Sequence, residues 1–172
     1  MKLRYRLFQD TDKETFSELI LHDLEAQAYL GWQDGEMSLE KLKSHTSWDF
    51  TLVFYNTENK EPVAISMADA RFNPQRIYLA SLYVIDTYRY QGIGTQVAID
   101  TMRFAFNQYA DMDKAYTYTM EGNEAAEKIN RSIGFKARGF YPEMFANGKG
   151  QRYWTIRKQD FELATSEVID AN

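Results

Sequence analysis

The segment Arg89-Tyr90-Gln91-Gly92-Ile93-Gly94 indicates both the fold and the functional class of this chain. It follows a nearly continuous apolar run, residues 77–85, which is typical of a central strand covered on both faces. It precedes a segment that we predict to be helical to about Tyr109. Where a helix begins, several backbone N–H groups lack partners, and with the helix dipole they form a binding site for phosphate. A tight turn that binds nothing is the alternative interpretation of the two glycines.

Two familiar phosphate-binding motifs do not fit this segment. A dinucleotide fingerprint requires a third glycine where this chain has Val97. A P-loop requires Gly-Lys-Ser/Thr, whereas Gly94 is followed by Thr95 and Gln96. NAD and ATP are therefore not the expected ligands.

Length and composition limit the remaining possibilities. A chain of 172 residues with 44% hydrophobic and 26% charged residues is expected to form one globular domain. The absence of cysteine excludes disulfides, thiolate metal sites and a cysteine nucleophile, and we predict no metal site. A net charge of −5 argues against nucleic-acid binding. Without a long apolar run or a signal peptide, we expect a soluble cytoplasmic protein with no membrane partner.

The pattern of apolar residues predicts a single α/β domain over residues 1–163, followed by a C-terminal tail over 164–172. Thr11 and Glu14 form a capping-box pattern at the start of a helix that Gly31 ends, and a second short helix is expected over residues 38–45. The apolar stripe of the first helix is Phe16, Leu19, Ile20 and Leu24. Strands are expected over residues 3–7, 50–55, 62–72, 77–85, 114–120, 135–140 and 152–157, with a turn at 73–75 and a further helix over 123–134.

Two blocks of sequence resemble the GNAT superfamily of N-acetyltransferases. Residues 89–94 match its Q/R-x-x-G-x-G/A signature. Asn123, Ala126, Ile129, Gly134 and Phe135 match its N-x-x-A…G-F segment, at the expected separation. The resemblance implies an α/β fold with a mixed, mostly antiparallel central sheet of about seven strands flanked by about four helices. It also implies that two strands splay apart at an acetyl-CoA site.

The resemblance places the cofactor on particular residues. The pantetheine arm would lie along Leu82, Tyr83 and Val84, and Arg89, Lys128 or Arg131 would add positive charge near the phosphates. The pyrophosphate would rest on the N–H groups of Gln91, Gly92, Ile93, Gly94 and Thr95, and Asn123, Ala126 and Asn130 would lie along the cofactor. Asn123 is also a candidate helix N-cap, a role that is compatible with cofactor binding.

The usual catalytic side chains of the family are absent. Many relatives have a tyrosine acid where this chain has Asn130, and a glutamate base near the position of Ser81. An amide does not donate a proton as an acid does, and a serine hydroxyl is a poor base. The remaining candidates are Tyr83 and Asp69, with Glu121 and Tyr118 as further ones. A relayed water, or orientation of the reactants alone, is the alternative source of catalysis.

The predicted function is transfer of an acetyl group from acetyl-CoA to a primary amine of a small molecule or a protein. The alternatives are a non-catalytic acetyl-CoA-binding regulatory module and a structural protein without a ligand. The acceptor is expected to meet Tyr29, Trp32, Asp34, Glu36 and Trp48, which are aromatic and acidic residues that suit a cationic amine. A homodimer is possible by analogy with the family.

Overall fold

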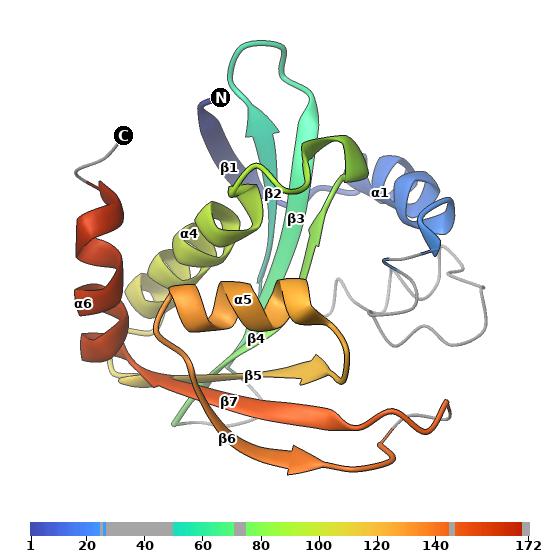
Figure 1. Cartoon of the computed structure of the whole chain (residues 1–172). Helices are drawn as coiled ribbons and strands as arrows, with labels where there is room; N and C mark the ends of the chain where they lie inside the picture. The colour runs from blue at the N-terminus through green and yellow to red at the C-terminus, as the bar shows by residue number, and fades with distance from the viewer. Residues whose placement is uncertain (25, 27–49, 71–74, 145–146, 170–172) are drawn as a thin grey trace.

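The computed structural model describes residues 1–24, 26, 50–70, 75–144 and 147–169, which form one seven-stranded sheet with helices packed against it (Figure 1). The strands are β1 (Leu3–Leu7), β2 (Phe50–Asn56), β3 (Pro62–Asp69), β4 (Ile77–Val84), β5 (Lys114–Met120), β6 (Lys136–Tyr141) and β7 (Gln151–Arg157). The helices in these residues are α1 (Asp12–Leu21), α4 (Ile93–Gln108), α5 (Glu124–Ser132) and α6 (Lys158–Ile169), and a 3₁₀ turn spans Asp86–Tyr88.

The strand order is β1-β2-β3-β4-β5-β7-β6, and every neighbouring pair is antiparallel except β4 and β5. The prediction of a mixed, mostly antiparallel sheet of about seven strands is therefore confirmed. β4 lies at the centre, as its apolar sequence indicated. A β-bulge interrupts it, because Met67 of β3 is opposite Ser81 whereas Ala68 is opposite Leu79, which leaves Ala80 without a partner in the register.

The two faces of the sheet have different cores. One face packs against α4 and α6, with Leu79, Trp154 and Ile156 from the strands meeting Met102 and Phe161 from the helices. The other face packs against α1 only over its first strands, where α1 and strands β2–β4 form a cluster of Phe16, Ile20, Val53, Ile65, Met67, Tyr83 and Ile85. Because side chains alternate along a strand, β2, β3 and β4 each contribute to both clusters.

Helix α1 begins as predicted but is capped differently. Thr11 has helical dihedral angles (φ −64°, ψ −20°) and makes no side-chain cap hydrogen bond, so the predicted capping box is wrong. The Asp12 carboxylate instead accepts hydrogen bonds from the Gln9 amide at 2.8 Å and from both terminal nitrogens of Arg6 at 2.6 and 2.7 Å. These bonds lower the pKa of Asp12, although burial acts in the opposite direction.

The ends of several elements differ from their predicted positions. α1 ends at Leu21, before Leu24 and before Gly31, so Leu24 is exposed while Phe16 and Ile20 form the buried stripe. β3 ends at Asp69, earlier than predicted. The predicted helix over residues 38–45, Gly31 and most of the turn at 73–75 lie outside the described residues. At the C-terminus, α6 continues through residues that the sequence assigned to a tail, because Thr165 extends the buried face of Phe161 by one helical turn.

Two glycines near the start of α4 have different structural roles. Gly92 is the N-cap of α4 and has a left-handed backbone (φ +78°), with open space around its Cα. Gly94 has no such backbone requirement, but a Cβ built on it would lie 2.8 Å from Cδ1 of Ile129 in α5 and 3.8 Å from Cγ2 of Val84 in β4. Gly94 therefore allows close packing of α4 between α5 and the central strand, whereas Gly92 allows the turn.

We expect Gly94→Ala to destabilise the fold by no more than about 1 kcal/mol, because the close atom, Cδ1 of Ile129, is the end of a flexible side chain and can move aside. Ile129→Val removes the clashing Cδ1, so the double variant should recover much of this loss in urea unfolding. Gly139→Ala is the matched control, because a Cβ at Gly139 meets no atom within 4 Å. Simple addition of the two single-variant effects would contradict the proposed contact.

Candidate active site

The central feature of the site is a gap between the edges of β4 and β5. The two strands pair only through Ile77 with Ala115 and Tyr78 with Tyr116, although β4 continues to Val84 and β5 to Met120. Directly after the last pair, the buried hydroxyl of Thr117 donates a 2.7 Å hydrogen bond to the Leu79 carbonyl. We call the divergent edges, residues 79–84 and 117–120, the β4–β5 wedge. The prediction that two strands splay apart is thus confirmed.

The wedge opens towards the turn that leads into α4. Ile93 and Gly94 are the first two residues of this helix, so their N–H groups have no intrahelical acceptor. The amide of Thr95, in contrast, already donates to the Gly92 carbonyl at 3.1 Å. The Gln91 side chain holds the turn together by donating to the Thr87 carbonyl at 3.1 Å. The turn therefore presents backbone donors, whose polarity favours an anion.

Arg89 is directed away from these donors, towards α1. Its guanidinium forms a short ion pair with Asp23, just beyond the C-terminal end of α1, and its Nε donates to the Val84 carbonyl at 3.0 Å. The guanidinium also lies 5.6 Å from the ring centroid of Tyr83. Burial opposes ionisation of Asp23, but hydrogen bonds from the Ala26 amide and Arg89 lower the pKa of the carboxyl. The expected charge of Arg89 near the phosphates is therefore largely compensated by Asp23.

The second sequence block forms helix α5 as predicted. The side chain of Asn123 caps the helix by accepting a 3.0 Å hydrogen bond from the Ala126 amide. Arg131 pairs with Glu127 and lies 5.3 Å from the ring centroid of Trp154, whereas Lys128 is exposed.

Asn130 carries an unsatisfied buried donor. The residue is 5% exposed, and its amide Nδ2 has no hydrogen-bond partner among the described residues. A buried amide without a partner costs about 1–3 kcal/mol. Because a ligand acceptor would remove this cost, Asn130 is a stronger cofactor candidate in the structure than in the sequence.

The other catalytic candidates come from β3 and β4. Ser81 is half-buried beside the bulge, and its carbonyl accepts a 3.2 Å hydrogen bond from the Ser66 hydroxyl. Tyr83 belongs to the cluster under α1, where burial and the nearby Asp23 raise the pKa of its hydroxyl. Asp69 is fully buried opposite Tyr78. Ser81 and Tyr83 share one face by strand alternation, whereas Leu82 and Val84 pack against the other core.

A cluster of tyrosines extends along the same sheet face, from β4 to β7. Tyr78 stacks on Tyr116 at 4.9 Å between ring centroids, and Tyr118 lies 5.1 Å from Tyr153. Burial, together with Tyr116 and Tyr118, raises the pKa of Tyr78 to about 12, and burial also raises the pKa values of Tyr116 and Tyr118. These hydroxyls are therefore neutral at physiological pH. Sequence reasoning named only Tyr118 here, and the Tyr-Thr-Tyr alternation of β5 was the available signal.

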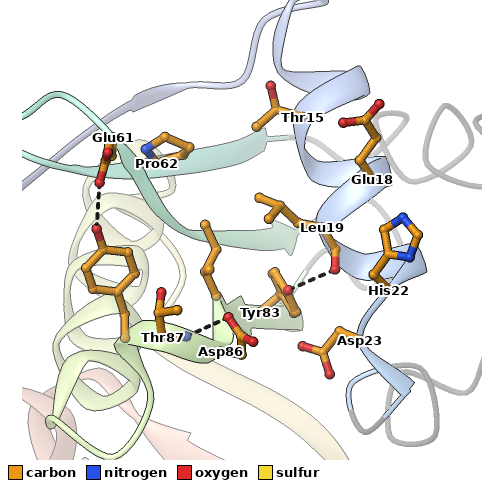
Figure 2. A pocket seen from close by; sticks show the side chains of 12 residues that line it. Thr15, Glu18, Leu19, His22, Asp23, Glu61, Pro62, Tyr83, Asp86 and Thr87 are labelled. Carbon is orange, nitrogen blue, oxygen red and sulfur yellow. Dashed lines mark hydrogen bonds between the residues drawn. The ribbon is translucent and has the colours of Figure 1, made fainter.

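A cavity of about 590 Å³ lies between α1, the start of β3 and the end of β4 (Figure 2). Four carboxylates line it, those of Glu18, Asp23, Glu61 and Asp86, and His22 adds a titratable ring. Figure 2 shows the Tyr83 hydroxyl directed at Leu19, at 3.4 Å from its carbonyl oxygen. The cavity brings together residues from three separate segments, so no local sequence pattern indicated it.

The last site residues predicted from the sequence are Glu121 and the expected acceptor residues. Glu121 accepts a 2.9 Å hydrogen bond from the Gly150 amide, which ties the end of β5 to the start of β7. The expected acceptor residues Tyr29, Trp32, Asp34, Glu36 and Trp48 lie outside the described residues. Within the described part of the chain, no group of three or more metal-binding side chains is assembled, and no helix has the length and apolarity to cross a membrane.

Comparison with solved structures shows the same fold in several acetyltransferases. The spermidine N-acetyltransferase from Vibrio cholerae, in complex with CoA and spermine, superposes with a TM-score of 0.78 at 13% identity, covering 92% of this chain and 97% of that one. The acetyltransferase (GNAT family) from Bacillus anthracis gives 0.77 at 14% identity, with coverage of 92% and 96%. A putative phosphinothricin N-acetyltransferase gives 0.74 at 15% identity, with coverage of 91% and 98%.

The sequence comparisons are consistent with this fold. No curated protein sequence matches the chain. The family model described as "Acetyltransferase (GNAT) family" matches residues 17–135, which include the second half of α1, the β4–β5 wedge, the α4 turn and α5. Because this match covers most of the chain, the protein belongs to the GNAT family of acetyltransferases, enzymes that use acetyl-CoA as the acetyl donor.

Proposed function

We propose that the protein transfers an acetyl group directly from acetyl-CoA to a primary amine of a small molecule or a protein. The observation that carries this proposal is the β4–β5 wedge, which opens at a helix N-terminus that presents free backbone N–H groups. An extended pantetheine arm supplies amide groups that match the unpaired strand edges, and the adjacent turn suits a pyrophosphate. Coenzyme A has both a pyrophosphate and an extended amide-containing arm, so it matches the turn and the adjacent strand edges together. A nucleotide alone would fill only the turn.

The proposal assigns the donor to named groups. The pantetheine lies along Leu82, Tyr83 and Val84, and the pyrophosphate accepts hydrogen bonds from Gly92, Ile93 and Gly94. Thr95 shapes the turn, because its amide already donates to the Gly92 carbonyl, and the side chain of Gln91 holds the turn by donating to the Thr87 carbonyl. The backbone N–H of Gln91 remains part of the proposed pyrophosphate site. Asn123, Ala126 and Asn130 border the cofactor from α5, and the unpartnered Nδ2 of Asn130 donates to it.

The amine approaches from the opposite face, which carries the tyrosine cluster. Its nitrogen attacks the thioester carbon, the carbon–sulfur bond breaks, the displaced proton passes to water and coenzyme A leaves as thiolate or thiol. Ser81 and Asn130 supply neither a strong base nor an acid, so orientation of the reactants provides most of the acceleration. The 590 Å³ cavity beside α1 lies on this same face, and its four carboxylates favour a cationic amine. That charge preference agrees with one neighbour whose name specifies spermidine.

The proposal also covers the cellular location, domain organisation and oligomeric state of the enzyme. We place it in the cytoplasm, which fits a chain without cysteine. A single catalytic domain and a homodimer follow from the family resemblance, and light scattering tests the second of these.

The function is tested by calorimetry with acetyl-CoA, followed by thiol release with a panel of polyamines, lysine peptides and amino acids. We expect saturable binding and thiol release with at least one cationic amine. Binding without thiol release across the panel would support the second candidate, a non-catalytic acetyl-CoA-binding module, which Ser81 and Asn130 favour. Failure to bind any coenzyme A species would refute both.

Replacing Asn130 separates a cofactor role from a structural one. Asn130→Leu removes an unsatisfied buried donor and keeps a similar volume, so the stability of the free protein should be unchanged or higher. The affinity for acetyl-CoA should fall about tenfold, the equivalent of one lost hydrogen bond. Thermal unfolding and calorimetry on the same preparations measure both quantities. An unchanged affinity would remove Asn130 from the donor site.

The pH dependence of the reaction should be set by the pKa of the acceptor amine and not by an ionisable group of the enzyme. Since burial raises the pKa of Tyr78 to about 12, the protein has no phenolate base in this cluster near neutral pH. We therefore expect kcat/KM for the amine to rise with pH until the amine itself is deprotonated. Acceptors with different amine pKa values should shift the inflection accordingly. An inflection that stays fixed near neutrality would reveal an enzyme base instead.

A further inference from the structure

A second cavity, of about 200 Å³, lies at the end of the sheet opposite the α4 turn. It is bordered by the starts of β4, β5 and β6, the end of β7 and the first turn of α6. Five basic side chains and a single acid line it, and we call it the basic cavity: Arg76, Lys114, Lys136, Arg138, Arg157 and Asp160. The whole chain has a net charge of −5, so this concentration of positive charge is a local feature.

Strand register and hydrogen bonds bring the basic groups together. Lys114 of β5 is opposite Arg157 of β7 in the register. Arg76 is held by a 2.8 Å hydrogen bond from its Nη1 to the Tyr153 hydroxyl, and Arg138 by a 3.0 Å bond from its Nε to the Thr155 hydroxyl. A guanidinium has five N–H donors, so each arginine keeps several donors for a ligand while its orientation is fixed.

Most of these charges are not compensated within the described part of the chain. There, Arg76, Lys136, Arg138 and Arg157 form no ion pair with a carboxylate, whereas Lys114 pairs with Asp113 at 3.8 Å. Other arginines differ, since Arg6, Arg89, Arg103, Arg131 and Arg152 each pair with an aspartate or glutamate. Like charges held close together repel one another, and a bound anion relieves that repulsion.

The size and charge of the basic cavity indicate the kind of anion. Pockets for drug-sized ligands have volumes of about 300–1,000 Å³, so this smaller cavity suits a single compact group. Oriented guanidinium groups bind phosphate through paired hydrogen bonds, and several surrounding cations favour a doubly charged ligand. We propose that the basic cavity binds a phosphate dianion, either inorganic phosphate or the phosphomonoester group of a small metabolite.

This site is separate from the proposed acetyl-CoA site. Arg76 directly precedes β4, whereas the α4 turn follows the end of that strand. The eight residues of β4 span seven steps of roughly 3.3 Å, which places its two ends about 23 Å apart. A phosphate in the basic cavity would lie beside Ala115, which forms one of the two residue pairs that join β5 to β4. It would therefore hold together the closed end of the wedge.

The test is calorimetry of the full chain with inorganic phosphate, at constant ionic strength and with coenzyme A already saturating. We expect one saturable site, with affinity about tenfold lower in Lys136→Gln/Arg157→Gln, which loses two of the five cations. Both side chains are exposed, so this variant should fold normally. The matched control is Lys2→Gln/Arg4→Gln, which removes two exposed charges near the β1 edge of the sheet and should bind phosphate as the parent does.

Three outcomes would overturn the proposal. No binding with or without coenzyme A would exclude the site, and equal weakening in both double variants would indicate only a general charge effect. Binding that appears only when coenzyme A is left out would place phosphate in the donor site. Glycerol phosphate and acetate are the comparison ligands. Binding of phosphate alone identifies the free ion as the ligand, and tighter binding of glycerol phosphate identifies a phosphomonoester. Acetate binding as tight as phosphate binding would contradict the preference for a dianion.

Discussion

The parallel pairing of β4 with β5, which extends over only two residue pairs, is the constraint on which the rest of the structure depends. Parallel neighbours require a crossover connection, and α4 provides it. The start of α4 therefore lies at the carboxyl end of β4, where the wedge is open. The strand edges and the helix N-terminus that together suit coenzyme A are thus adjacent because of the topology, and no additional binding loop is needed.

This arrangement explains how an acidic protein can hold an anionic cofactor. Arg89 is the charged residue of the signature segment, yet Asp23 neutralises much of its charge and ties the turn to α1. In the proposed site, binding at the turn then depends on backbone N–H groups, whose direction is fixed by the helix. Gly92 provides the required left-handed backbone, and Gly94 allows α5 to pack close to the same turn. The basic cavity differs from the turn, because charged side chains line it and backbone N–H groups are not its main donors.

The sequence predicted the parts of the fold that depend on local patterns. The apolar run of β4, the glycine turn and the N-cap of α5 at Asn123 are all local, and all were predicted correctly. The capping box at Thr11 failed because Arg6 and Gln9 recruit Asp12 instead. The tyrosine cluster and both cavities escaped prediction because they depend on strand register, which brings together residues as distant in sequence as Tyr78 and Tyr116.

The proposed site has well-formed groups for the acetyl donor but lacks a strong side-chain acid or base. One physical argument accounts for both properties. Acetyl-CoA is already an activated thioester, so a neutral amine held in line with its carbonyl carbon needs less assistance than an unactivated ester would. In the proposed site, the buried amide of Asn130 would hold the cofactor by a hydrogen bond, which does not require a proton to move. Burial raises the pKa of Tyr78, Tyr116 and Tyr118 on the opposite face, so these hydroxyls do not compete for the amine proton. An enzyme built in this way gains rate mainly from position, and its pH dependence is then a property of its substrate.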